Sequence, residues 1–311
     1  MSLIVESLVK IYGQQHAVDG ISFVANEGEI LGFLGPNGAG KSTTMKIATC
    51  FIPPTSGTIK VAGFDVLESP IDVKRNVGYL PEHNPLYLDM YVAEYLNFSG
   101  AVHGLKGTKL DNRVKEMIET VGLTLEYKKK IGALSKGYRQ RVGLAQAMIH
   151  DPKVLILDEP TTGLDPNQII EIRTVIKNLG KEKTVIFSTH IMQEVQALCD
   201  RVIIINNGKL VADNKVSELK TSQKKQQVLT LEFTVEIDSS FIKQFDTVQE
   251  VNNLGKGNYE VVCSLDKDIR ADLFKLSADK GWTLVGMKQE EKSLEDIFTK
   301  LTGNTNLTNE N

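Results

Sequence analysis

Short apolar runs alternate with amphipathic segments along the first two thirds of the chain. Residues 30–34, 154–157 and 185–187 are apolar, a pattern typical of strands buried on both faces of a sheet. Between the first two runs, apolar positions recur with helical spacing, as in residues 92–99 and 114–121. The pattern predicts an α/β fold, a mostly parallel sheet covered by helices, with a helical block inserted into it.

The pattern changes after residues 221–227, which are all polar. Residues 229–237 then alternate strictly between apolar and polar, as half-buried strands do, and apolar residues at 259, 261, 263 and 265 repeat that signal. We expect a small α+β domain with the order strand–helix–strand–strand–helix–strand. Its later expected elements are a helix at 269–278, a strand at 282–287 and an amphipathic helix at 294–301.

These patterns predict two domains joined by a polar linker. The predicted boundaries are a first domain at 1–221 with its helical block at about 83–150, a linker at 222–227, a second domain at 228–302 and a disordered tail at 303–311.

A glycine-rich loop follows the apolar run at 30–34 and matches G-x-x-x-x-G-K-[ST]. Its residues are Gly35, Pro36, Asn37, Gly38, Ala39, Gly40, Lys41, Ser42 and Thr43. Main-chain N–H groups in such a loop converge on phosphate oxygens, and the following helix points its positive end at the same anion. Lys41 can reach the β- and γ-phosphates, and the Ser42 hydroxyl can ligate Mg²⁺. The loop therefore predicts binding of a nucleotide's phosphate chain with Mg²⁺, although such a loop alone fits many nucleotide enzymes.

Two carboxylates end the apolar run at 154–157. Asp158 suits a role in holding Mg²⁺ through water, and Glu159 can polarise a water aligned with the γ-phosphate. Adjacent acids at a strand end can also form a solvated turn. Beside a phosphate loop, however, the arrangement favours ATP hydrolysis, with Glu159 as the catalytic base.

Composition and charge narrow the class of protein. The 311 residues carry 36 Lys and Arg against 39 Asp and Glu, so no basic excess indicates a nucleic-acid partner. No apolar run approaches the roughly 18 residues of a membrane-spanning helix, and the first residues do not resemble a secretory signal. Three widely spaced cysteines argue against a disulfide framework. We expect a soluble, cytoplasmic protein.

Together with the sequence LSKGYRQR at 134–141, these motifs resemble the ATP-binding subunits of ATP-binding cassette (ABC) transporters over roughly residues 1–220. The resemblance implies further site residues. Tyr12 would stack on adenine with Val18 as an apolar wall, and Glu82 takes the position of the glutamine loop and of a metal ligand. His190 matches the switch histidine, with a catalytic role.

The resemblance also implies a signature loop containing Ser135 and Gly137, and a loop at 163–166 that joins the halves of a dimer. The sequence departs from the family at two places. Glu82 replaces a glutamine, which removes an amide donor and adds a negative charge; it could ligate Mg²⁺ more strongly or serve mainly as the hinge that couples to the membrane subunit. Lys136 replaces a glycine of the signature loop; it could add a favourable charge at the second nucleotide or point outward into solvent.

The family arrangement implies a homodimer with each ATP held between one phosphate loop and the opposite signature loop. The longer segments at 79–87, 134–147 and 188–195 resemble subunits paired with ABC-2-type membrane proteins, in particular those associated with gliding motility. This implies a transport motor, peripheral on the inner face of the cell membrane, that drives a separate ABC-2-type transmembrane subunit. The alternatives are a soluble ABC ATPase acting on nucleic acid or ribosomes, and an assembly factor. For the second domain we expect a role in dimer contact or regulation.

Overall fold

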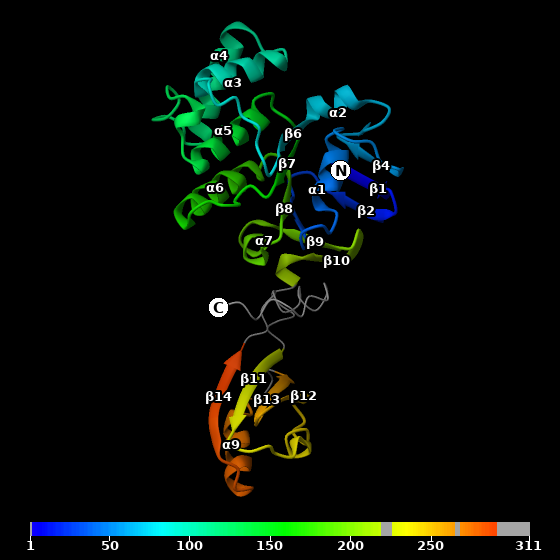
Figure 1. Cartoon of the computed structure of the whole chain (residues 1–311), viewed down its shortest axis with the longest axis vertical. Helices are drawn as coiled ribbons and strands as arrows, with labels where there is room; N and C mark the ends of the chain where they lie inside the picture. Colours follow the sequence, from blue (N-terminus) through cyan, green and yellow to red (C-terminus); the bar gives the residue numbers. More distant parts are fainter. Residues whose placement is uncertain (1, 219–225, 265–267, 291–311) are drawn as a thin grey trace. The chain divides into compact units, whose positions relative to one another are not determined.

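The chain folds as two units, residues 1–216 and 217–311, which are described separately (Figure 1). The computed structural model describes residues 2–218, 226–264 and 268–290. The predicted amphipathic helix at 294–301 and the tail at 303–311 lie outside this range.

A six-stranded sheet forms the centre of the first unit, in the order β10-β9-β3-β8-β7-β6. Five neighbouring strands run parallel and β10 is antiparallel to β9, which confirms the predicted mostly parallel sheet. The strands are β3 (Ile30–Leu34), β6 (Val77–Leu80), β7 (Val154–Asp158), β8 (Thr184–Thr189), β9 (Arg201–Asn206) and β10 (Lys209–Lys215).

The register of this sheet brings the ends of three strands together. Leu34 at the end of β3 pairs with Thr189 at the end of β8, and Ser188 pairs with Asp158 at the end of β7. Because parallel strands finish at the same edge, the segments that follow them start side by side. The phosphate loop, Glu159 and His190 therefore meet at one edge, although up to 155 residues separate them in sequence.

A second, antiparallel sheet has the order β2-β1-β4-β5 and was not anticipated by the sequence analysis. Its strands are β1 (Leu3–Tyr12), β2 (Gln15–Ala25), β4 (Ser56–Val61) and β5 (Phe64–Asp65). The β1–β2 pairing shifts register between Val5 and Leu8, and Ser7 has a φ of 45°. This irregularity interrupts the period-two pattern by which a half-buried strand is recognised.

Helix α1 (Lys41–Ala48) packs into a core shared by both sheets. Met45 and Ile47 of α1 belong to the same buried cluster as Phe23 from the antiparallel sheet and Phe33 and Ile203 from the parallel one. Each such side chain contributes about 1.5–3 kcal/mol when fully buried. The loop that precedes α1 is therefore attached to a helix that this core holds in place.

The inserted block is helical, as predicted, and contains α3 (Val92–Val102), α4 (Gly107–Thr120), a 3₁₀ turn at Ile131–Ala133 and α5 (Lys136–Met148). The predicted apolar faces are buried, for example at Leu96 and Ile118. This unit also contains α2 (Pro70–Asn76), α6 (Pro166–Leu179) and α7 (Met192–Leu198).

The second unit contains an antiparallel sheet in the order β12-β13-β11-β14, packed with α9. Its elements are β11 (Gln226–Phe233), β12 (Val248–Gly255), β13 (Asn258–Ser264), α9 (Arg270–Asp279) and β14 (Leu284–Glu290). The predicted α+β character is therefore correct. The expected first helix is only a 3₁₀ turn at Ser239–Phe241, and Gln226 and Gln227, assigned to the linker, belong to β11.

The strand predicted at 229–237 ends early, at Phe233. Beyond it the chain leaves the sheet: Val235 is exposed, and the backbone N–H and C=O of Ile237 are bound by the buried Tyr259 hydroxyl at 2.9 Å each. The alternating pattern of 234–237 wrongly predicted a strand, because Tyr259 holds the backbone of Ile237 in a loop and Ile237 does not pair within the sheet. The strand predicted at 282–287 is likewise displaced, beginning at Leu284.

Candidate functional site

The phosphate loop joins β3 to α1 as predicted. Gly40 precedes α1 with a φ of 111°, and a Cβ there would lie 2.4 Å from the Ala17 carbonyl oxygen. Only glycine fits this left-handed, crowded position. The Lys41 side chain is buried and donates to the carbonyl oxygens of Gly35 at 2.7 Å and Pro36 at 3.2 Å.

A cavity of about 290 Å³ lies over this loop. Its lining residues are Asn37, Gly38, Gly40, Lys41, Ser42, Thr43, Glu82 and Glu159. The fold thus brings most of the predicted loop residues and two of the three predicted carboxylates to one cavity. Asp158 lies directly behind it, at the end of β7.

The two acids at the end of β7 are both buried but have different surroundings. Asp158 is 2 % exposed, and its Oδ1 has no hydrogen-bond partner among the described residues. Glu159 is 6 % exposed and lies at a φ of 50°, a left-handed conformation that costs a residue with a side chain about 1–3 kcal/mol. Strain of this kind in a cavity wall is typical of functional residues, and it turns the Glu159 side chain toward Lys41.

The Glu159 carboxylate is contacted by three side chains. His190 Nδ1 lies 2.9 Å from Oε1, Lys41 Nζ lies 3.8 Å from Oε1, and the Thr162 hydroxyl donates to Oε2 at 3.3 Å. The structure therefore brings the predicted base and the predicted switch histidine into direct contact. Thr162 was missed by the sequence analysis, because a lone threonine carries no motif signal.

Burial and the neighbouring charges shift the pKa of Lys41 in opposite directions. Burial lowers the pKa of the Lys41 ammonium, and the carboxylates of Glu159, Asp158 and Glu82 partly offset that effect. One cation among three carboxylates leaves the site net negative, so a bound metal cation would be needed for a phosphate chain to be favoured there. This is the electrostatic setting expected for a metal-bound phosphate chain.

The other predicted site residues lie outside the cavity. Ser135 caps α5, accepting from Tyr138 N at 3.4 Å, and Gly137 lies in the first turn of the same helix. Tyr12 is about half exposed at the end of β1, with Lys10 Nζ 5.2 Å from its ring centre. Val18 is fully buried beneath the loop, so in this structure it offers no surface to a ligand.

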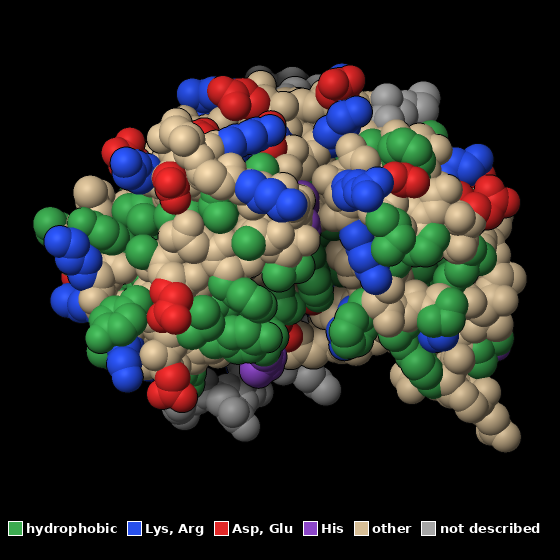
Figure 2. Space-filling model, turned by 90° about the horizontal axis from the view of Figure 1, so that it is seen from above, with side chains coloured by type: hydrophobic (Ala, Val, Ile, Leu, Met, Phe, Trp, Pro, Cys, Tyr) green, Lys and Arg blue, Asp and Glu red, His purple; other side chains and the backbone are tan. Residues whose placement is uncertain are grey.

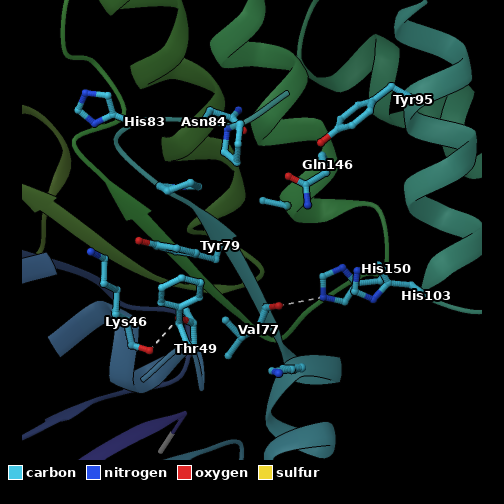
Figure 3. A pocket seen from close by; sticks show the side chains of 15 residues that line it. Lys46, Thr49, Val77, Tyr79, His83, Asn84, Tyr95, His103, Gln146 and His150 are labelled. Atoms are coloured by element: carbon cyan, nitrogen blue, oxygen red, sulfur yellow. Dashed lines mark hydrogen bonds between the residues drawn. The ribbon is translucent and has the colours of Figure 1, made fainter. Parts of the chain in front are cut away.

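A larger groove of about 550 Å³ lies between the helical block and the rest of the first unit. Aromatic side chains line it, including Phe51, Tyr79 and Tyr95, and its charged lining residues are Lys46 and Lys74 (Figure 3). Figure 2 shows a hollow with hydrophobic side chains on its walls and Lys and Arg side chains near its rim. The groove is therefore apolar inside and positively charged.

Two histidines at the far side of the groove stack on each other. The rings of His103 and His150 lie 3.9 Å apart and nearly parallel, and a ring nitrogen of His150 lies 3.0 Å from the Val77 carbonyl oxygen. Burial, together with His103 and nearby cationic side chains, lowers the pKa of His150 to about 4. His150 is therefore neutral at pH 7, and Lys46 and Lys74 carry the groove's charge.

Within residues 2–218, 226–264 and 268–290, no helix has both the length and the apolar character needed to cross a bilayer.

Comparison with known proteins identifies the family. A family profile described as "ABC transporter" matches residues 18–162. The chain is 38% identical over 301 residues to the uncharacterized ABC transporter ATP-binding protein YxlF of Bacillus subtilis, covering 96% of this chain and 99% of that protein. It is 34% identical to the bacitracin transport ATP-binding protein BcrA of Bacillus licheniformis, covering 97% and 98%.

Among solved structures, the fold is similar to the ATP-binding cassette MJ0796, described as a dimer in a post-hydrolysis state bound to ADP and Pi. The TM-score is 0.64 at 23% identity, covering 69% of this chain and 98% of that one, which supports the fold alone. The near-complete match to YxlF, together with the phosphate loop and Glu159 at one cavity and His190 in contact with Glu159, shows that this chain belongs to the ATP-binding proteins of ABC transporters and is an ATPase.

Proposed function

We propose that this protein is the ATP-hydrolysing subunit of an ABC-2-type exporter, working with Mg²⁺ as an ATP-bound homodimer. The observation that carries the proposal is the presence of Lys41 and Glu159 in the cavity over the phosphate loop, with His190 in contact with Glu159. In this proposal Lys41 binds the β- and γ-phosphates, Glu159 accepts a proton from the attacking water, and His190 orients Glu159 and the γ-phosphate.

The donor atoms around the cavity fit Mg²⁺. Hydroxyl and carboxylate oxygens are the ligands this ion prefers, and Ser42, Glu82 and Asp158 supply them. The partnerless Oδ1 of Asp158 supports this assignment, since a buried carboxylate oxygen otherwise pays a desolvation cost without compensation. A bound Mg²⁺ would neutralise charge on the β- and γ-phosphates.

The charge of Glu82 gives the metal proposal a direct test. Glu82→Gln removes one carboxylate from the cavity, so we expect the Mg²⁺ concentration that half-saturates ATP hydrolysis to rise about tenfold, with little change when Mn²⁺ is saturating. Titrating the ATPase rate with each metal measures this. Glu68→Gln, which alters an exposed carboxylate outside the cavity, is the control. An unchanged Mg²⁺ requirement in Glu82→Gln would remove Glu82 from the metal site.

The N-terminus of α5 supports the dimer. Ser135 is exposed there, whereas Gly137 is buried against Gln168, so it is the exposed cap and the positive end of the helix that can face an anion on a second copy. We propose that each signature loop faces the ATP of the other protomer, as the dimeric description of MJ0796 suggests.

Tyr12 would stack on adenine, beside the buried Val18. The second unit, which we propose to be a separate domain, would serve dimer contact or regulation.

The groove between the helical block and the rest of the first unit supports a membrane partner. Its aromatic walls and two lysines, without an acidic lining residue, fit a short apolar segment of the membrane subunit that carries an acidic side chain. Phe51 on its wall is 74 % exposed, so its ring is accessible to a partner. We propose that this contact holds the protein at the inner face of the cell membrane.

Co-purification tests the proposed function. We expect the affinity-tagged chain to retain a polytopic membrane protein in detergent, and Phe51→Asp with Lys74→Glu to lose it by about tenfold while keeping ATP binding. The control pair is Leu125→Asp with Lys109→Glu, at exposed positions outside the groove. Retention of ribosomes or DNA instead would favour the soluble alternatives.

The proposal also extends to the process that the exporter serves, for which there are two candidates. The resemblance of residues 79–87 and 188–195 to gliding-associated subunits favours a role in gliding motility, and the match to BcrA favours export of an antimicrobial compound. Deleting the gene separates the two. Loss of surface motility with unchanged drug sensitivity supports the first, and increased drug sensitivity with normal motility supports the second.

A further inference from the structure

A buried carboxylate stands directly behind the switch histidine. Glu194 in α7 is 1 % exposed, accepts a hydrogen bond from the Thr189 hydroxyl at 2.9 Å, and its Oε1 lies 3.7 Å from Arg173 Nη2. Burying a carboxylate is costly unless its charge is compensated, and Thr189 and Arg173 supply that compensation to Glu194. None of the three residues lines the ATP cavity.

The Thr189 hydroxyl, just before His190, connects Glu194 to the backbone just after His190. It donates to Glu194 and accepts from the Ile191 backbone N–H at 3.1 Å. Thr189 is itself the last residue of β8 and is fully buried. The residues before and after His190 are thus anchored to Glu194, while the His190 ring is partly exposed and reaches Glu159.

Arg173 connects this anchor to α6, and α6 also contacts the signature helix α5, beside which it lies (Figure 1). The Gln168 amide lies against Gly137, where a Cβ would stand 2.4 Å from Gln168 Oε1. Glu171 forms an ion pair with Arg141 of α5, whose guanidinium also donates to the Val121 carbonyl oxygen at 2.9 Å. One helix therefore contacts both the signature element and the anchor of the switch histidine.

We propose that Glu194 is a positioning residue for ATP hydrolysis: with Thr189 it fixes the His190 loop, and through Arg173 it makes the placement of His190 depend on α6 and hence on the signature helix. This rests on the proposed role of His190. In the proposed dimer, the signature loop of one protomer faces the ATP of its partner, whereas its His190 lies beside its own ATP. The contacts through α6 therefore couple binding of the signature loop at one ATP to the alignment of His190 at the other. Mispositioning of a reacting group by an ångström can cost 10–100-fold in rate, about the range available to such control.

The test uses the full-length protein and steady-state ATP hydrolysis with saturating Mg²⁺. We expect Thr189→Val and Arg173→Met each to lower kcat about tenfold while the KM for ATP stays within about twofold, since neither residue touches the cavity. Glu194→Gln keeps an acceptor for Thr189 and should fall between these variants and the unaltered protein. Lys177→Met removes an exposed cation from the same helix and should leave kcat unchanged.

A double variant separates positioning from general damage to the fold. In the His190→Ala background, Thr189→Val should cause no further loss of kcat, because the histidine it positions is gone. An additive loss, a loss confined to KM, or unchanged kcat in both Thr189→Val and Arg173→Met overturns the inference. Normal hydrolysis by His190→Ala alone would instead overturn the proposed role of His190, and this inference with it.

Discussion

Glu159→Gln should bind ATP with unchanged affinity and hydrolyse it at least 100-fold more slowly. The amide has nearly the same shape but cannot accept a proton from water, and loss of a general base costs about 10²–10⁴-fold. Because the ATP that joins the protomers is no longer consumed, we also expect ATP-dependent dimers to accumulate. Nucleotide-binding titration, phosphate release and size-exclusion chromatography with and without ATP measure the three effects.

The control for Glu159→Gln is Glu182→Gln, the same chemical change at an exposed position after α6. It should hydrolyse ATP normally and form no lasting dimer. Hydrolysis by Glu159→Gln at the rate of the unaltered protein would remove Glu159 from its role as base. A slow variant that stays monomeric with ATP would leave the base in place and contradict the proposed homodimer.

Lys41→Ala should weaken ATP binding by about 100-fold. A charge-assisted contact to phosphate contributes about 1.5–3 kcal/mol, and here the cation also offsets Glu159, which lies 3.8 Å away. Removing the cation leaves that carboxylate facing the phosphates with less compensation. Equilibrium titration with a fluorescent ATP analogue, with Mg²⁺ present, measures the affinity.

Lys46→Ala serves as the matched control, because it removes an exposed lysine from the last turn of the same helix. Its affinity for ATP should equal that of the unaltered protein. Full affinity in Lys41→Ala would contradict the assignment of the phosphate loop, whereas a loss in both variants would point to damage to α1 instead.

Some elements could be predicted because their signal lies within a short stretch of sequence. The loop at 35–43 needs glycines at set positions, and the strands β3 and β7 are apolar because both of their faces are buried, so both could be predicted from the chain alone. Family resemblance added His190 and Glu82. The α/β fold followed from the uninterrupted apolar runs of its strands, and the inserted helical block followed from the period of 3.6 residues.

Where a signal is not local, sequence reasoning failed for identifiable reasons. A bulge near Ser7 hid the antiparallel sheet, and Ile237 looked like a strand residue although Tyr259, 22 positions away, holds it in a loop. Thr162 has no motif, and its hydrogen bond to Glu159 appears only once the turn after β7 is formed.

The amino-acid sequence by itself therefore predicted a phosphate-binding loop and the residues that we propose carry the chemistry. Only the tertiary structure decided that Glu159 and His190 touch, that Glu194 and Arg173 stand behind the histidine, and that one helix connects them to the signature element. The physical reason is that sheet register and side-chain packing depend on contacts between residues distant in the chain, and these leave no periodic trace in the sequence.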